Sequence, residues 1–344
     1  MSTIATEGLG QPVEVGSIDG ELKKLWEADE ASTNASLMNL LIYTEEPHQL
    51  LPNSQVAQSL TEEHACRAVL IGMDRKHSEP SVEAWITAHC HLAHGKKSIC
   101  SEQVSFLLRG RAVGRLRNTV FAHLNSDLPL VFWWQGELSD LFEEKLYRPL
   151  DRLIFDSSAW ADPAAGFVKI QQARGDVGCH MVTQDLAWTR SFYFRLALAG
   201  IFDDPAALSA FPSLKKVTLK ARNDQKTTAL LTIAWMAEMA KWVHTSELNF
   251  ESQEGVKIEI DLQFADGGPA LAEMIIEGDD FLAKVTRERE TKHLCQHIES
   301  GTHLLHRKVP ADLESPSDLV AEQLSRGGKN SLFLRVLPRF LELL

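Results

Sequence analysis

The stretch "LPLVFWWQG" (residues 128–136) constrains the fold more than any other part of the chain. Its residues are apolar without a break up to Trp133 and Trp134. Because neighbouring side chains of a strand point to opposite faces, such a strand is buried on both faces, as in a parallel sheet covered by helices. We expect both rings to pack in the core, one toward each covering layer. Gly136 marks the strand's end, where open α/β sheets bind ligands, so the stretch also points to a site.

The first half of the chain alternates between predicted strands and helices. A strand, a helix and a second strand in succession predict a right-handed parallel crossover, and this order occurs twice. Residues 1–165 are therefore predicted to form an α/β domain with a mostly parallel sheet and helices on both faces. Two of its strands alternate in polarity and are expected to face water on one side. The predicted strands are 36–45, 67–74, 81–93, 101–110, 128–134 and 151–158, and the predicted helices are 17–30, 52–66, 113–124 and 137–150.

The pattern changes after the Pro/Ala/Gly-rich passage that ends near residue 165. Residues 166–344 are predicted to form an α+β domain with long apolar helices and an antiparallel meander. We expect Asp224 to cap the second of these helices. We expect the apolar stripe along that helix, which includes Trp235 and Met239, to belong to the core. The predicted helices are 184–202, 224–243, 315–326 and 331–343, and the predicted strands are 215–221, 256–264, 270–278 and 281–288.

Charge and hydropathy exclude several classes of protein. The net charge of −12 argues against broad nucleic-acid binding, which depends on neutralising phosphates. No apolar run approaches the roughly 20 residues that cross a bilayer, and the first residues lack the features of a signal peptide. We therefore expect a cytoplasmic protein that binds neither nucleic acid nor membrane.

The five cysteines, Cys66, Cys90, Cys100, Cys179 and Cys295, are widely spaced and include no CxxC motif. We expect free thiols, with a redox role for one pair as the alternative.

The segment "HCHLAHGKKSIC" (89–100) could supply zinc ligands, namely His89, Cys90, His91, His94 and Cys100. Alternation along a strand would send His89 and His91 to the face opposite Cys90, so we favour a polar strand end with a turn at Gly95. No metal or cofactor is predicted.

A basic run begins where a predicted strand ends and a predicted helix starts. Helix N-termini attract anions, and residues four apart share a helix face, so a phosphate or an acidic partner surface could bind here. The alternative is a solvated helix face that pairs with acidic side chains. The run consists of Arg109, Arg111, Arg115 and Arg117.

A second polar group follows the strand "DRLIF". Asp156, Ser157 and Ser158 could form a ligand rim beside the tryptophan strand, or they could cap the next element. The glycine-rich segments match neither GxGxxG nor a P-loop, and no Gly-x-Ser-x-Gly elbow is present. We therefore predict a protein without a catalytic constellation.

Several segments in order resemble one family, the glucose-6-phosphate dehydrogenase assembly proteins (OpcA). The resemblance covers most of residues 38–243, and its most specific elements are "DLPLVFWW…DRLIFDSS" and "DLAWTR…R…LAGIFD". It implies a non-catalytic protein that binds glucose-6-phosphate dehydrogenase and promotes its assembly or allosteric activation in the oxidative pentose phosphate pathway. The positions that match the motifs are Trp133, Trp134, Asp151, Arg152, Asp156, Ser157, Asp185, Trp188, Thr189, Arg190 and Arg195.

The chain departs from this family pattern at two positions. Gln135 stands where a basic residue is expected, and Phe194 stands where a tryptophan often precedes the arginine. The arginine run and the strand ends at 133–136 and 156–158 are predicted to share one sheet edge and to form the partner surface. The alternative is an α/β protein that binds a sugar phosphate, or a residual enzyme.

Overall fold

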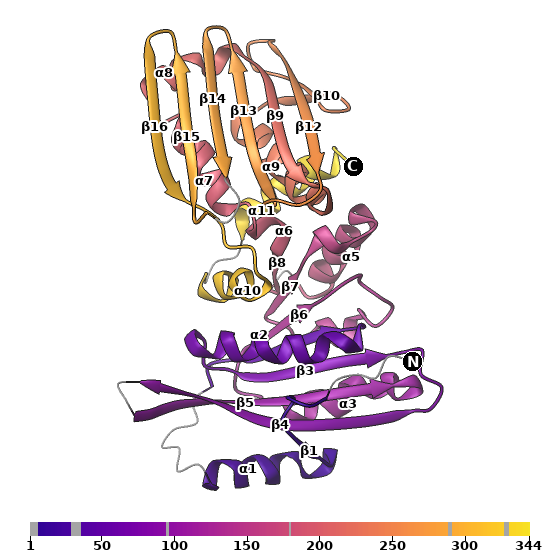
Figure 1. Cartoon of the computed structure of the whole chain (residues 1–344). Coiled ribbons are helices and arrows are strands. Elements are labelled where there is room, and N and C mark those ends of the chain that lie inside the picture. Colours follow the sequence, from indigo (N-terminus) through magenta and orange to yellow (C-terminus); the bar gives the residue numbers. More distant parts are fainter. Residues whose placement is uncertain (1–5, 29–35, 94–95, 179, 288–290, 327–329) are drawn as a thin grey trace. The chain divides into compact units, whose positions relative to one another are not determined.

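The computed structural model describes residues 6–28, 36–93, 96–178, 180–287, 291–326 and 330–344. The chain divides into two compact units, each made of three separate segments (Figure 1). Unit 1 comprises Met1–Asp156, Gly166–Gln184 and Val320–Gly327. Unit 2 comprises Ser157–Ala165, Asp185–Leu319 and Gly328–Leu344. The predicted boundary after residue 165 stays a prediction.

Unit 1 is built on an eight-stranded sheet with the strand order β1-β4-β5-β3-β2-β6-β7-β8. Neighbouring strands from β5 to β7 are parallel, while β4 is antiparallel to β5 and β1 to β4. The predicted mostly parallel sheet is thus confirmed. The strands are β1 (Gln11–Val13), β2 (Asn39–Thr44), β3 (Arg67–Asp74), β4 (Ser81–Ala93), β5 (Lys96–Arg109), β6 (Leu130–Trp134), β7 (Arg152–Phe155) and β8 (Val182–Asp185).

The order β5-β3-β2-β6-β7-β8 has the doubly wound pattern in which the chain runs outward in one direction from β2 and in the other from β6. Figure 1 shows α2 along one face of this sheet and α1 on the opposite side. The helices of this unit are α1 (Ile18–Ala28), α2 (Leu50–Glu63), α3 (Leu116–Val120), α4 (Glu144–Tyr147) and α5 (Pro163–Asp176), with the 3-10 helices η1 (Val15–Ser17), η2 (Pro47–Gln49), η3 (Gly110–Arg115) and η4 (Phe121–His123).

The tryptophan strand occupies the middle of the sheet, as the sequence predicted. Trp133 and Trp134 are 4% and 0% exposed, so both rings pack in the core. The ring of Trp134 lies 4.2 Å from that of Tyr43 on β2, and its Nε1 donates a hydrogen bond to the Glu137 carbonyl. The polar atom of the indole is therefore satisfied inside the core.

Three predicted elements of unit 1 differ from the structure. The helix expected over 137–150 is only the single turn α4, because Ser139 organises a tight turn that places Phe142 against Trp134. The helix expected over 113–124 is broken into η3, α3 and η4. The strand β5 was expected to face water, but its central residues are buried on both faces. On one face Gln103 donates to the Oγ of Ser54 on α2, and on the other Phe106 stacks on His123 of η4.

Unit 2 contains a second eight-stranded sheet, in the order β10-β11-β12-β9-β13-β14-β15-β16. The predicted antiparallel meander is present from β13 to β16. The expectation that the meander includes residues 256–264 is wrong, because β9 lies between β12 and β13 and pairs with β12 in parallel. The strands are β9 (Leu214–Arg222), β10 (Val243–Ser246), β11 (Asn249–Glu251), β12 (Lys257–Ala265), β13 (Leu271–Gly278), β14 (Phe281–Arg287), β15 (His293–Ser300) and β16 (His303–Pro310).

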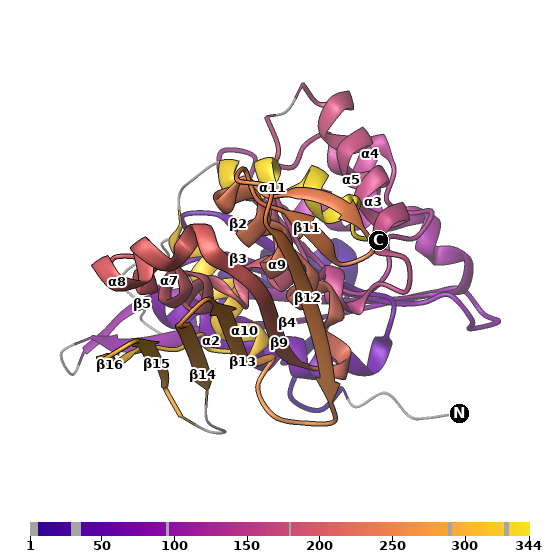
Figure 2. The same cartoon turned by 90° about the horizontal axis from the view of Figure 1, so that it is seen from above.

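Helices cover one face of this second sheet, and the view from above places α7 and α8 on one side of β13–β15 (Figure 2). The helix expected over 184–202 is two helices, α6 and α7, separated at Arg190–Ser191. Asp224 does not cap α9, because its carboxylate pairs with Arg222 at 2.6 Å. The helices are α6 (Leu186–Thr189), α7 (Phe192–Ile201), α8 (Pro205–Ala210), α9 (Lys226–Ala240), α10 (Pro316–Ser325) and α11 (Ser331–Leu341), with η5 (Ser157–Ala159), η6 (Phe211–Ser213) and η7 (Asn223–Gln225).

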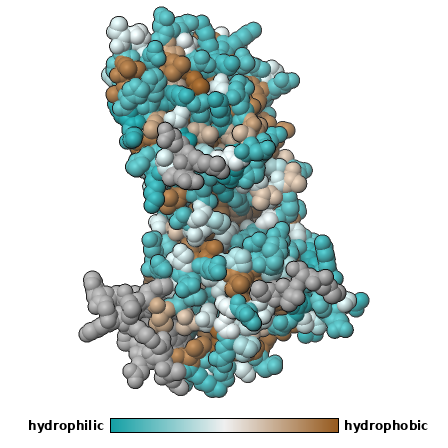
Figure 3. Space-filling model, viewed as in Figure 1, coloured by the Kyte–Doolittle hydropathy of each residue, from teal (hydrophilic) through white to brown (hydrophobic). Residues whose placement is uncertain are grey.

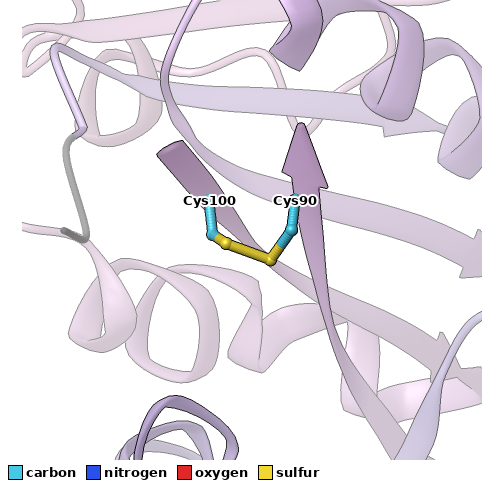
Figure 4. Close-up of a disulfide and its surroundings, with 2 residues drawn as sticks. All are labelled: Cys90 and Cys100. Atoms are coloured by element: carbon cyan, nitrogen blue, oxygen red, sulfur yellow. A yellow bond between two sulfur atoms is a disulfide. The ribbon is translucent and has the colours of Figure 1, made fainter. Parts of the chain in front are cut away.

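Cys90 and Cys100 form a disulfide between β4 and β5 (Figure 4). The expectation of free thiols is wrong for this pair, because the antiparallel register puts the two residues directly opposite each other. The thiols of Cys66 and Cys295 are free, and burial raises the pKa of Cys66 to about 12. Cys179 lies outside the described residues.

Within the described ranges, no group of three or more His, Cys, Asp or Glu residues is placed to hold a metal ion. His89 instead hydrogen-bonds the Oε1 of Gln103 at 2.9 Å, and His94 and Gly95 lie outside the described residues. None of the helices in the part of the chain that the structure describes has the length and apolar character needed to span a membrane. The surface seen in Figure 3 is largely hydrophilic, with apolar residues in small groups.

Candidate functional site

The arginine run lies at the carboxyl edge of the unit 1 sheet, where β5 ends. Because β5, β6 and β7 run in the same direction, the predicted shared edge for the arginines and the ends of β6 and β7 is present within this unit. Gly110 starts the turn with a φ of +52°, and a Cβ there would lie 2.8 Å from the His77 carbonyl oxygen. This close approach explains why the strand turns sharply into η3 at a glycine.

The four arginines differ in what they contact. Arg109, at the end of β5, forms an ion pair with Glu83 on β4. Arg111, Arg115 and Arg117 are exposed, and no carboxylate among the described residues pairs with them. The helix expected to start at this run is not a regular α-helix, since the 3-10 helix η3 precedes the five-residue α3. The exposed set Arg111, Arg115 and Arg117 is called the arginine face below.

The first family motif has residues at both edges of the sheet. Asp151 precedes β7 at the amino edge, where its Oδ2 accepts a hydrogen bond of 2.7 Å from the backbone N–H of Leu130. Arg152 donates from Nη1 to the Gln323 carbonyl at 2.6 Å, and burial lowers its pKa. Both side chains therefore join segments of unit 1 that lie far apart in the sequence, and they do not share an edge with Trp133 and Trp134.

Ser157 belongs to the same motif but lies in unit 2, where it binds Asp185 of the second motif. Its backbone N–H and its Oγ donate to the two carboxylate oxygens of Asp185 at 3.0 and 2.5 Å. The same carboxylate caps α6 by accepting from the N–H of Ala187. Thr189 closes the turn by donating from Oγ1 to the Asp185 carbonyl at 2.8 Å. Because Ser157 and Asp185 are completely buried, this cluster holds the start of α6 in place. The preceding Asp156, at the end of β7, is only partly buried.

Arg190 and Arg195 are also buried in unit 2. The Cζ atom of Arg195 lies 3.4 Å from the ring centroid of Trp188, and its Nη1 donates to the Trp188 carbonyl at 2.7 Å. Arg190 donates to the Oγ of Ser158 at 3.4 Å. The arginines of the second motif thus hold the junction of α6 and α7, and their guanidinium groups face the protein interior.

A buried carboxylate anchors the next turn of this junction. The two oxygens of Asp312 accept hydrogen bonds of 2.8 and 2.9 Å from the N–H groups of Tyr193 and Phe194, at the start of α7. Burial raises the pKa of Asp312 to about 6, although these hydrogen bonds and the nearby Arg195 oppose the shift. Sequence inspection had not singled out Asp312, since it lies more than a hundred residues from its partners.

The switch point of the unit 1 sheet lies between β2 and β6, where the direction of chain progression reverses. The amides of Asn53 on α2 and Gln135 after β6 pair reciprocally at 2.8 and 2.9 Å. The backbone N–H of Gln135 donates to the Tyr43 carbonyl at 3.0 Å. Gln135, which departs from the family pattern, therefore has a structural partner at the switch point.

The loops after β2, β3 and β6 are joined by a set of ionic contacts, here called the Arg75 clamp. Arg75, just after β3, binds both carboxylate oxygens of Asp140 at 2.6 and 3.0 Å and lies 3.4 Å from Glu45. Glu45 also accepts the hydroxyl of Tyr43 at 2.8 Å. The guanidinium of Arg75 holds the pKa of Asp140 below its usual value. Sequence analysis did not find Arg75 or Asp140, although each follows a strand end, which was the available signal.

Unit 2 also carries an apolar pocket of about 340 Å³ between its helices. Two of its large apolar side chains, Leu208 and Met239, are exposed. Met239 was expected in the core and is instead exposed, since helical periodicity does not show which end of an apolar stripe is covered. The pocket is lined by Leu198, Ala199, Phe202, Leu208, Phe211, Trp235, Met236, Met239 and Ala240.

Among solved structures, the fold is similar to that of KijD10, a 3-ketoreductase from Actinomadura kijaniata. In the open conformation with TDP-benzene and NADP, that structure has a TM-score of 0.52 and 8% sequence identity, covering 90% of this chain and 97% of that chain. In its complex with NADP, the TM-score is 0.50 at 8% identity, covering 89% of this chain and 95% of that chain. At this identity the likeness shows the fold alone.

Sequence comparisons identify the family. The model of the glucose-6-phosphate dehydrogenase subunit N-terminal domain (OpcA) matches residues 57–172, and the model of the corresponding C-terminal domain matches residues 181–337. The OxPP cycle protein OpcA of Synechococcus elongatus is 21% identical over 315 residues, which are 83% of this chain and 69% of that protein. Since both domain models match in order, the chain belongs to the OpcA family of glucose-6-phosphate dehydrogenase assembly proteins.

Proposed function

We propose that this protein binds glucose-6-phosphate dehydrogenase and promotes its assembly or its allosteric activation, without catalysing a reaction of its own. The observation that carries the proposal is the ordered match to both domains of the OpcA family. The Synechococcus relative is named as an OxPP cycle protein, which supports a role in the oxidative pentose phosphate pathway. A protein that binds one state of an enzyme more tightly shifts the population toward that state, which is how the activation would arise.

The arginine face is proposed as part of the surface that meets the dehydrogenase. Its support is a contrast in contacts. Arg111, Arg115 and Arg117 are exposed, and no carboxylate in the described ranges pairs with them. Of the motif arginines, Arg190 and Arg195 are buried and Arg152 is half-buried. Exposed guanidinium groups form bidentate contacts with carboxylates of a partner, and such charges steer association. The expected partner surface is therefore acidic.

The test is the initial rate of the dehydrogenase from the same organism against substrate concentration, with and without this protein. We expect a lower apparent KM, or a larger assembly by light scattering of the mixture. Unchanged kinetics and an unchanged assembly, with both proteins folded, would contradict the proposal.

Charge reversal then tests the surface. The double variant Arg111→Glu with Arg115→Glu is expected to raise the concentration needed for half-maximal activation by about tenfold. A matched control is Lys145→Glu on α4 with Arg148→Glu just after it. Both side chains are exposed, and the variant makes the same change of net charge in the same unit. Equal losses in both variants would reject the arginine face as a specific surface.

A second candidate function is binding of a sugar phosphate at the arginine face, because unpaired guanidinium groups also bind phosphate. Thermal unfolding with glucose-6-phosphate alone separates the two functions. A ligand at a hundredfold its Kd stabilises a protein by about 2.7 kcal/mol. An unchanged unfolding midpoint at millimolar glucose-6-phosphate would therefore contradict this candidate and leave the dehydrogenase proposal standing.

A further inference from the structure

The strand order of unit 1 belongs to a fold that ordinarily binds dinucleotides. In such sheets the pyrophosphate lies at the switch point, on a glycine-rich turn between the first strand and its helix, where free backbone N–H groups point at it. The equivalent turn here runs from the end of β2 to the start of α2, over residues 45–49. Its residues show whether a dinucleotide fits.

The turn offers negative charge where a pyrophosphate needs donors. It reads Glu45-Glu46-Pro47-His48-Gln49 and contains no glycine. Pro47 has no N–H, the N–H of Glu46 donates to the Oγ1 of Thr44 at 3.1 Å, and that of Gln49 donates to the Glu46 carbonyl. The carboxylates of Glu45 and Glu46 would repel a pyrophosphate, and these two backbone donors are already used.

The crevice itself is filled by side chains of the protein. The reciprocal amide pair of Asn53 and Gln135 spans the space between the start of α2 and the end of β6. Asn53 is buried, so separating the pair to admit a ligand would leave a buried amide unsatisfied, at a cost.

The Arg75 clamp engages the arginine that follows β3. An arginine just after the second strand of such a sheet is placed to meet a phosphate on the ribose of a bound dinucleotide. Here the guanidinium of Arg75 binds Asp140 through two hydrogen bonds and contacts Glu45. It therefore holds three loops together at the same edge where a dinucleotide would lie.

We infer that unit 1 is a doubly wound domain whose switch-point crevice is closed by its own side chains and accepts neither NAD nor NADP. Glu45 and Glu46 replace the phosphate-binding turn, the Asn53–Gln135 pair fills the crevice, and the Arg75 clamp fixes the loops above it. These side chains hold together the segments that follow β2, β3 and β6. This inference does not rest on the proposed function.

The full chain, without any dehydrogenase present, is titrated with NADPH while energy transfer from tryptophan to the nicotinamide is recorded. Trp134 lies at the end of β6, so a dinucleotide at the switch point would accept its emission. We expect no saturable signal. A saturable signal that NADP+ or NAD+ displaces would overturn the inference.

Thermal unfolding in the presence of NADP+ gives a second readout that does not depend on optics. A dinucleotide bound with a Kd of about 50 µM would, at a hundredfold excess, raise the midpoint by several degrees. We expect an unchanged midpoint for NADP+ and for NAD+. A rise that is lost in Arg75→Ala would overturn the inference and identify Arg75 as a nucleotide contact.

The clamp itself is tested by a double-mutant cycle of Arg75→Ala and Asp140→Ala, measured by urea unfolding. We expect the two substitutions to be non-additive, since each removes the same contact. The matched pair Arg148→Ala and Glu144→Ala, an exposed ion pair on α4, serves as control and is expected to show a smaller coupling. Additive effects at Arg75 and Asp140 would overturn the claim that a clamp closes the crevice.

Discussion

Two groups of arginines in this protein look alike in the sequence but differ in the structure. Arg152, Arg190 and Arg195 stand in the family motifs, and their guanidinium groups donate to carbonyl and hydroxyl oxygens inside the fold. The arginine face, in contrast, is exposed at the end of β5. In this protein the arginines of the family motifs stabilise the fold through internal hydrogen bonds, and the candidate partner surface lies outside the motifs.

Arg195→Met is expected to have the largest effect on stability. It removes the cation above the Trp188 ring and the hydrogen bonds to the Trp188 carbonyl and the Ser191 hydroxyl, all of them buried. We expect a loss of about 3 kcal/mol in the free energy of unfolding, measured in urea. Arg148→Met, on an exposed side chain, is the control and should lose less than about 0.5 kcal/mol. If both variants lost similar amounts of unfolding free energy, a buried motif arginine would contribute no more to stability than an exposed one.

Asp312, beside Arg195, makes the buried junction sensitive to pH. Its folded pKa of about 6 lies above the usual aspartate value of 3.8, so the folded state binds the proton more tightly than the unfolded state. Its contribution to stability is therefore fully present below about pH 4 and is lost as the pH rises through 6. We expect a fall on the order of 2 kcal/mol between pH 4 and 7, relative to Asp312→Asn.

The check is urea unfolding of both proteins across this range. If the free energy of unfolding changed with pH in the same way for both proteins, Asp312 would not titrate with a raised pKa in the folded state.

Arg152→Met is expected to have a moderate effect. Its guanidinium donates to the carbonyl of Gln323, and its burial is partial, so the loss should be about 1–2 kcal/mol. The unfolding midpoint in urea measures it. A loss as small as that of the Arg148 control would place Arg152 with the exposed arginines.

The double variant of the arginine face is expected to have the smallest effect on stability. Arg111→Glu with Arg115→Glu should change the free energy of unfolding by less than about 0.5 kcal/mol, because both side chains are exposed. The same variant is expected to lose activation of the dehydrogenase, so stability and activation should separate. A variant that loses both together would assign these arginines a structural role.

The parallel sheet of unit 1 could be predicted because its strands are apolar at nearly every position. β2 and β6 are buried along their whole length. A continuous apolar run of this length is typical of a parallel strand that is covered on both faces. The helices were less predictable. Residues 137–150 have a helical apolar spacing, yet turn hydrogen bonds around Ser139 decide their structure. Residues 184–202 form two helices instead of one. The Ser191 hydroxyl donates to the Trp188 carbonyl at the end of α6, and Arg195 of α7 donates to the same hydroxyl.

The candidate site could be predicted only in part. The sequence placed the arginine run and the ends of β6 and β7 at one edge, since parallel strands end together. It did not show that Arg190 and Arg195 are buried, because burial depends on how the elements of unit 2 pack together and not on local spacing. The disulfide was missed for a related reason: the register of β4 and β5, which pairs Cys90 with Cys100, does not follow from spacing.

The division of the chain has a consequence for its synthesis. Unit 1 takes its last segment from Val320–Gly327, and the Gln323 carbonyl in that segment receives the hydrogen bond from Arg152. A ribosome delivers this segment after most of unit 2 has already emerged, at about 5–20 residues per second. The N-terminal sheet can collapse early, but it must wait for nearly the whole chain before its amino edge is complete. The completion of unit 1 is therefore expected to be a late step of folding, after most of unit 2 has been synthesised.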